Sequence, residues 1–137
     1  MAGGSGTRFW PESRKRKPKQ LLRIFSDRTM VRETVERILP EIPFDRIMIV
    51  TTEDYSNEIK KEIPEISETM IVAEPRGRNT APCIALAAYK IFKQDPEGVL
   101  VILPADHLIA NEQAFLEVLG LAYRVASKRD FLIISLS

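Results

Sequence analysis

A glycine-rich stretch near the amino terminus has the composition of an anion-binding loop. Residues 2–6 read Ala-Gly-Gly-Ser-Gly, and glycines allow a tight turn that brings successive backbone N–H groups close to a phosphate. Arg8 follows the loop, and Lys19 comes later, after Pro18. A guanidinium that binds two oxygens, together with a point-charge ammonium, suits a polyphosphate. The alternative is a solvated amino-terminal segment, which the basic run Arg14–Lys17 would also favour.

The loop differs from the two common glycine motifs that bind phosphate. No Lys-Ser or Lys-Thr pair follows its last glycine, and its third glycine is out of place for a dinucleotide fingerprint. Loops of this type normally follow a buried strand, and Met1-Ala2 is too short to supply one. We therefore expect the first strand to be missing from the chain as given.

A second polar stretch lies between a predicted strand and a predicted helix. Residues 74–82 read Glu-Pro-Arg-Gly-Arg-Asn-Thr-Ala-Pro, and the junction of a strand's carboxyl end with a helix amino terminus favours ligand binding. Thr80 and Pro82 have a simpler explanation as a helix cap and a first-turn proline. Arg78 and Asn79 are not needed for capping, and their side chains can hydrogen-bond a purine or a ribose.

An aspartate follows the most apolar segment of the chain. Asp106 comes shortly after Val99–Leu103, where a carboxylate is costly unless it is paired or bound to a cation. The alternative is that Asp106 caps a following turn. His107 is the only histidine, and without a second His or Cys nearby it does not indicate a transition-metal site. His107 could instead orient Asp106 or a sugar.

Composition limits the class of protein. The 137 residues with 45% apolar content are enough for one domain with a core, and 20 basic residues against 19 acidic ones give a net charge of +1. A nucleic-acid-binding domain is usually more basic, and aromatic residues make up only 7%. Cys83 is the single cysteine, so no intrachain disulfide can form. The longest apolar runs are strand-sized, and we expect a cytoplasmic location.

Helical and strand-like segments alternate after the loop. The predicted helices are Thr29–Leu39, Thr52–Ile63, Pro82–Lys93 and Asn111–Arg129, and the predicted strands are Arg46–Thr51, Thr69–Ala73, Gly98–Leu103 and Phe131–Leu136. In the last helix, the residues expected to face inward are Phe115, Val118, Leu119, Ala122 and Val125. Alternation with strands apolar on both faces predicts one α/β domain over residues 1–137, with a mostly parallel sheet between helical layers.

Several stretches together resemble one enzyme family. GGSGTRFWP at residues 3–11, SRKRKPKQLL at 13–22, EPRGRNTAP at 74–82 and LPADH at 103–107 resemble the signature of sugar-1-phosphate nucleotidyltransferases. Among these, they are most similar to the mannose-1-phosphate guanylyltransferases. The resemblance implies a three-layer, Rossmann-like α/β/α fold. Because family members are more than twice as long, we expect this fold to be incomplete, lacking the first strand and the carboxyl-terminal half. Glu12 departs from the family pattern, in which an apolar residue usually follows the proline.

The resemblance also implies roles for individual residues. Arg8 would stabilise the leaving pyrophosphate, Lys19 would neutralise the reacting phosphate, and Asp106 would bind Mg²⁺, so these three form the expected catalytic set. Mg²⁺ prefers hard oxygen ligands completed by water and phosphate. Glu74 belongs to the segment expected to contact the base. The residues expected to bind the nucleotide are Ala2, Gly3, Gly4, Gly6, Thr7, Arg78, Asn79 and Thr80.

The implied reaction is transfer of GMP from GTP to mannose 1-phosphate, releasing pyrophosphate. The expected partners are therefore GTP and mannose 1-phosphate, with no nucleic acid and no membrane, while a homo-oligomer stays open. Two alternatives are an inactive nucleotide-binding fragment or regulatory subunit, and a nucleotidyltransferase for another sugar phosphate or nucleoside triphosphate. A nucleic-acid binder that uses Arg14–Lys19 is a third, although no array of aromatic residues lies beside that tract.

Overall fold

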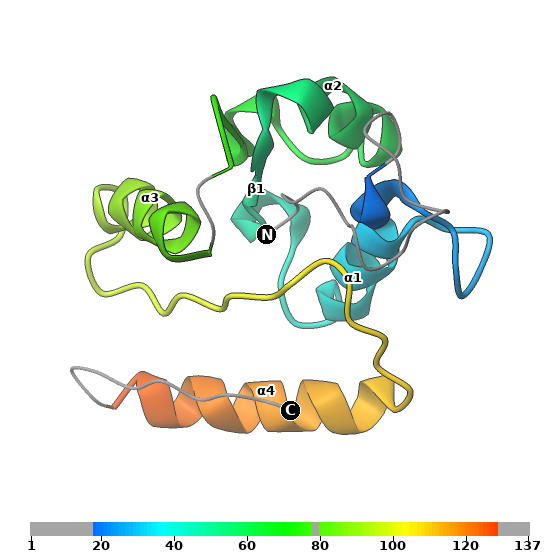
Figure 1. Cartoon of the computed structure of the whole chain (residues 1–137). Helices are drawn as coiled ribbons and strands as arrows, with labels where there is room; N and C mark the ends of the chain where they lie inside the picture. Colours follow the sequence, from blue (N-terminus) through cyan, green and yellow to red (C-terminus); the bar gives the residue numbers. More distant parts are fainter. Residues whose placement is uncertain (1–17, 78–79, 129–137) are drawn as a thin grey trace.

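The computed structural model describes residues 18–77 and 80–128 (Figure 1). Two parallel strands, β1 (Ile49–Thr52) and β2 (Ile71–Glu74), are joined through helix α2 (Glu53–Glu62). The register pairs Ile49 with Ile71 and Thr52 with Glu74. The other helices are α1 (Met30–Ile38), α3 (Thr80–Phe92) and α4 (Glu112–Ala126), with short 3-10 turns η2 (Lys19–Leu21), η3 (Phe44–Arg46) and η4 (Glu68–Met70). The parallel α/β arrangement expected from the sequence is confirmed.

Helices cover both faces of the two-stranded sheet. Alternate residues of a strand point to opposite faces, and here Ile49 packs with α1 and with the fully buried Ile59 of α2. Val50 and Val72 point the other way and pack against Cys83 of α3. Figure 1 shows α1 and α3 on opposite sides of β1. The layered arrangement predicted from alternation therefore exists around this sheet.

Helix α1 begins and ends where its sequence predicts. The side chain of Thr29 accepts a hydrogen bond from the backbone N–H of Arg32 at 3.4 Å, as an N-cap does. Val31, Val35 and Ile38 are buried at helical spacing.

The strands β1 and β2 begin two or three residues later than predicted. The turn η4 ends directly before β2, and η3 ends at Arg46, with two residues between it and the start of β1. Residues in a 3-10 turn satisfy backbone groups locally and so do not take part in the sheet. Thr52 precedes α2, but its side chain makes no capping hydrogen bond. Its Oγ1 is buried without a hydrogen-bond partner among the described residues.

The segment Gly98–Leu103 is not a strand in the structure. It runs through the described part of the chain without regular secondary structure, although Val101 and Leu103 pack against the core as apolar residues should. An extended segment becomes a strand only when a neighbouring strand pairs with its backbone. Within the described ranges the sheet consists of β1 and β2, which pair with each other. The predicted strand Phe131–Leu136 lies outside the described residues.

Helix α4 buries less of its apolar surface than the sequence predicts. Asn111 caps it by accepting a hydrogen bond from the backbone N–H of Ala114 at 3.0 Å, and Leu119 is buried. Val118 and Val125 were expected to face inward, but they are 42% and 38% exposed. Figure 1 shows α4 at one end of the described structure, next to the extended segment before it. Only one side of the helix therefore has described elements to pack against. None of the helices in the described ranges is long and apolar enough to cross a membrane.

Candidate nucleotide site

The structure brings two of the three predicted catalytic residues together. The Nζ atom of Lys19 donates a hydrogen bond to Oδ2 of Asp106, forming an ion pair between residues that are 87 positions apart. The side chains are 25% and 21% exposed, so the pair lies at the surface of the fold with partial access to solvent. A cation and a carboxylate are thus available to a ligand at one point.

Lys19 is positioned by buried neighbours on both sides. Pro18 and Gln20 are almost fully buried, and Leu22 belongs to the buried apolar residues. The backbone N–H of Met30 donates to the carbonyl of Leu22 at 3.0 Å, which fixes the η2 turn to the start of α1. Because its neighbours are buried, the lysine is held at a defined place, whereas an exposed tail would leave it free to move.

Asp106 is anchored to the same part of the core. Ala105, the preceding residue, is buried in the cluster that contains Val31 and Val35 of α1. On the other side of Asp106, the backbone carbonyl of His107 accepts a hydrogen bond from Arg37 of α1 at 3.5 Å. The His107 side chain itself is exposed. Helix α1 therefore supports both members of the Lys19–Asp106 pair.

The carboxyl ends of β1 and β2 form a second polar region. Thr52 and Glu74 are register partners at the last position of each strand, and Glu74 is buried. The backbone of Gly77 lies beside Thr52, since a Cβ built on Gly77 would be 3.6 Å from Thr52 Cγ2. Thr80 is exposed and begins α3. This edge is where parallel α/β sheets bind ligands.

The remaining predicted site residues lie outside the described part of the chain. This applies to one catalytic residue, to the loop and to two residues of the second motif, namely Arg8, Ala2, Gly3, Gly4, Gly6, Thr7, Arg78 and Asn79. Their roles stay predictions.

Cys83 is a packing residue, as its position in α3 predicts. It is buried in one cluster with Val50 and Val72. Burial raises the pKa of the thiol, and the nearby Glu74 carboxylate raises it further. The thiol is therefore held in its neutral, unreactive form.

The donor set for a metal is small within the described residues. No group of three or more His, Cys, Asp and Glu side chains gathers there. Asp106 provides one carboxylate beside the cationic Lys19. This fits Mg²⁺, which often uses one or two carboxylates and takes its other ligands from water and substrate phosphates.

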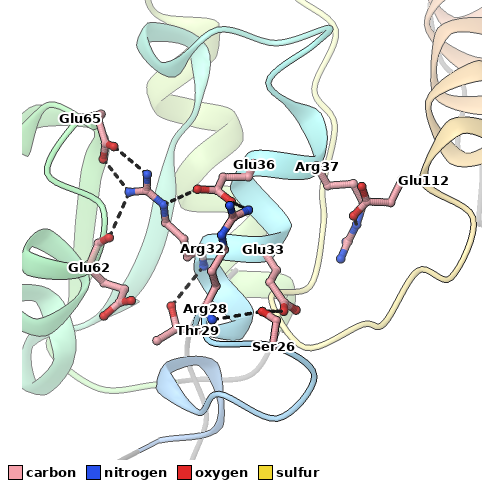
Figure 2. Close-up of polar contacts among 10 residues, drawn as sticks. All are labelled: Ser26, Arg28, Thr29, Arg32, Glu33, Glu36, Arg37, Glu62, Glu65 and Glu112. Atoms are coloured by element: carbon pink, nitrogen blue, oxygen red, sulfur yellow. Dashed lines mark hydrogen bonds and ion pairs between the residues drawn. The ribbon is translucent and has the colours of Figure 1, made fainter.

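Sequence reasoning missed the arginines of α1. Arg32 donates to both Glu65 oxygens at 2.8 Å and to Glu36 at 2.7 Å, and Glu36 also pairs with Arg28 (Figure 2). Hydrogen bonds and charge from Glu65 and Glu36 raise the pKa of the Arg32 guanidinium. Arg37 is buried instead and donates to Glu112 at 3.4 Å. Glu36 lies one helical turn after Arg32, but Glu65 and Glu112 are 33 and 75 positions from their arginines, so helical periodicity gave no signal for these two contacts.

A comparison with known protein families assigns the chain to the family that its sequence motifs resemble. The chain matches the nucleotidyl transferase family over residues 1–135, and it belongs to that family. The partial α/β fold and the paired Lys19 and Asp106 are thus found in a nucleotidyltransferase chain.

More specific similarity is found among individual relatives. The chain is 42% identical over 118 residues to a putative mannose-1-phosphate guanylyltransferase of Vibrio cholerae. This alignment covers 84% of the chain and 25% of the relative. It is 36% identical over 138 residues to the alginate biosynthesis protein AlgA of Pseudomonas aeruginosa, covering 97% and 28%. It is also 35% identical to mannose-1-phosphate guanylyltransferase of Escherichia coli. The chain spans about a quarter of the length of these relatives.

A solved structure shares the fold. A protein of Thermus thermophilus described as mannose-1-phosphate geranyltransferase superimposes with a TM-score of 0.76 at 29% identity. The similarity covers 91% of this chain and 38% of that one. The resemblance to sugar-1-phosphate nucleotidyltransferases is therefore confirmed at the level of family and fold.

Proposed function

We propose that this chain carries the nucleotide side of a transfer of GMP from GTP to mannose 1-phosphate. In this reaction a phosphate oxygen of mannose 1-phosphate forms a bond to the α-phosphorus of GTP. The bond from that phosphorus to the bridging oxygen breaks, and pyrophosphate leaves with the electron pair. The attacking group is already an anion, so the protein needs no nucleophile of its own and acts by positioning and charge stabilisation.

The observation that carries the proposal is the contact between Lys19 and Asp106. Two polyanions must approach each other, and the ammonium of Lys19 would neutralise the reacting phosphate. Asp106 holds that ammonium in place and would be the protein ligand of Mg²⁺. When bound, Mg²⁺ supplies positive charge that lowers the repulsion between the two substrates. Arg8 is proposed to stabilise the pyrophosphate.

We propose a separate role for Glu74 in selecting the base. Its buried carboxylate lies at the carboxyl edge of the sheet, and a carboxylate is an acceptor with two oxygens. Guanine has two neighbouring donors, N1–H and the 2-amino group, which match that acceptor. Adenine has an unprotonated nitrogen at the equivalent ring position, so it would leave the carboxylate unsatisfied. Arg78, Asn79 and Thr80, which follow in the same sequence motif, are proposed to hold the rest of the nucleoside.

Calorimetric titration of the full 137-residue chain with GTP, ATP, CTP and UTP in MgCl₂ tests the proposal. We expect GTP to bind at least about tenfold more tightly than ATP, because a site built around hydrogen-bond partners discriminates strongly against a ligand that lacks them. Glu74→Gln should reduce this preference. Equal affinity for all four nucleotides would contradict the proposal.

An assay with mannose 1-phosphate separates binding from turnover. The proposal predicts that GDP-mannose and pyrophosphate form together and only with GTP. GTP binding without either product would favour the alternative of a nucleotide-binding chain that does not catalyse the transfer.

A further inference from the structure

We infer that Arg37 is a positioning residue that holds the segment after Asp106 in its binding geometry. This inference rests on the proposed function of Asp106. Arg37 belongs to α1, yet its two hydrogen bonds reach residues 70 and 75 positions away, the carbonyl of His107 and the carboxylate of Glu112. It therefore ties the turn that carries Asp106 and the first residue of α4 to one helix.

Burial distinguishes Arg37 from the other arginines of this region. Its side chain is only 5% exposed, whereas those of Arg32 and Arg28 are 23% and 63% exposed. A buried guanidinium is costly unless its donors find acceptors. Here the two acceptors come from either end of residues 107–112. Figure 2 shows Arg37 and Glu112 pointing toward each other, apart from the Arg32 cluster.

Holding the His107 carbonyl restricts where Asp106 can lie. The two residues are consecutive, and the backbone between them has few free torsions. Ala105 is fixed on the other side by burial in the core. With both flanking residues held, the Asp106 carboxylate stays near Lys19. Without Arg37, the residues after Asp106 would lose this attachment to α1.

Arg32 offers a matched control on the same helix. It also makes several ion pairs, but its carboxylate partners are Glu36 and Glu65. The test compares Arg37→Met with Arg32→Met in the full chain, using three measurements: hydrogen exchange of the amides in residues 103–111, calorimetric affinity for GTP in MgCl₂, and thermal unfolding. Methionine keeps the apolar stem and removes the charge in both variants.

We expect R37M to speed amide exchange in residues 103–111 and to weaken GTP binding by about 10- to 100-fold, the usual cost of losing a group that orients a ligand. R32M should lower the unfolding temperature but leave both other measurements at wild-type values. Equal loss of affinity in the two variants, or unchanged exchange in R37M, would overturn the inference.

Two further variants keep the test decisive if R37M does not fold. Arg37→Lys keeps the charge but cannot span both acceptors, and Glu112→Gln changes an exposed side chain. Both variants should weaken GTP binding less than R37M does, by about three- to tenfold for the loss of one hydrogen bond. Both should also speed amide exchange in residues 103–111. Wild-type behaviour in both would refute the role of Arg37. If the wild-type chain binds no GTP, the proposed function fails, and the exchange measurement still decides whether Arg37 holds the turn.

Discussion

Lys19 and Asp106 form an ion pair, although one follows the amino-terminal basic run and the other follows the segment 98–104. The ammonium comes from a turn fixed by Pro18, Gln20 and Leu22. The carboxylate comes from a turn fixed by Ala105 and by the Arg37 hydrogen bond to His107. Two motifs that are far apart in the sequence thus supply opposite charges to one place, which is the arrangement that the proposed function uses.

A double-mutant cycle tests whether the two residues act as a unit. We expect Lys19→Met and Asp106→Asn each to weaken binding of Mg²⁺-GTP by about 10- to 100-fold, the range for a charged hydrogen bond. The double variant should lose less than the sum of the two free energies, because each single change already disrupts the shared contact. Calorimetry measures all four affinities. Lys60→Met is the control: it removes an ion pair with Glu68 elsewhere on the surface and should leave the affinity for Mg²⁺-GTP unchanged. Strict additivity would show that the residues act independently.

The ion-pair cluster of Arg32 is expected to stabilise the fold without affecting the site. Arg32 joins α1 to Glu65 and also donates to the backbone carbonyl of Glu62 at 3.2 Å. Arg32→Met should lower the free energy of unfolding by about 1–2 kcal/mol, above the usual value for an exposed pair because the contact is bidentate. Urea denaturation measures this. Arg23→Met serves as the control, since Arg23 is more exposed and lies 4.0 Å from Glu62. A loss in R32M no larger than in R23M would contradict the prediction.

The same cluster predicts a pH dependence of stability. The hydrogen bond from Arg32 holds the pKa of Glu65 below its ordinary value. Because the folded pKa is the lower one, the stabilisation is complete above the ordinary glutamate pKa of about 4.3 and is lost as the pH falls through the folded value. The wild type should therefore exceed Glu65→Gln in stability at pH 7, and the two should converge in acid. A difference that stays constant from pH 7 to pH 3 would be inconsistent with this assignment.

Cys83 should be unreactive in the folded chain. It is buried beside Val50 and Val72, and burial raises its pKa. Since the thiolate is the reactive form, a thiol reagent at pH 8 should modify Cys83 slowly until urea unfolds the protein. The fully unfolded chain gives the reference rate. Modification of the folded chain at that same rate would show that α3 does not cover the sheet as described.

The elements that the sequence predicts best are those specified by local chemistry. Thr29 and Asn111 are N-cap residues in the structure, because a cap depends on a side chain and a backbone N–H three residues later. The segment Gly98–Leu103 has the apolar composition of a buried strand, but pairing depends on a neighbour that composition does not specify. Val118 and Val125 follow the helical period of α4, yet their burial depends on which elements cover that helix.

The candidate site was predictable where motifs marked it. Lys19 and Asp106 were recognised through stretches of sequence, and the structure adds that they are in contact. Arg37 was not predicted, because its role depends on His107 and Glu112, and nothing near it in the sequence indicates these partners. A charged residue on a helix is usually solvated, and only the fold shows that this one is buried.

Chemical labelling of Lys19 tests the central claim most directly. Lys19 and Lys60 are 25% and 34% exposed and each is paired with a carboxylate, so they form a matched pair for acetylation followed by mass spectrometry. If the Lys19–Asp106 pair binds the phosphates, Mg²⁺-GTP at saturating concentration should slow acetylation of Lys19 and leave the rate at Lys60 unchanged. Equal rates at Lys19 with and without the nucleotide, under conditions where calorimetry shows GTP bound, would place the nucleotide elsewhere and contradict the account.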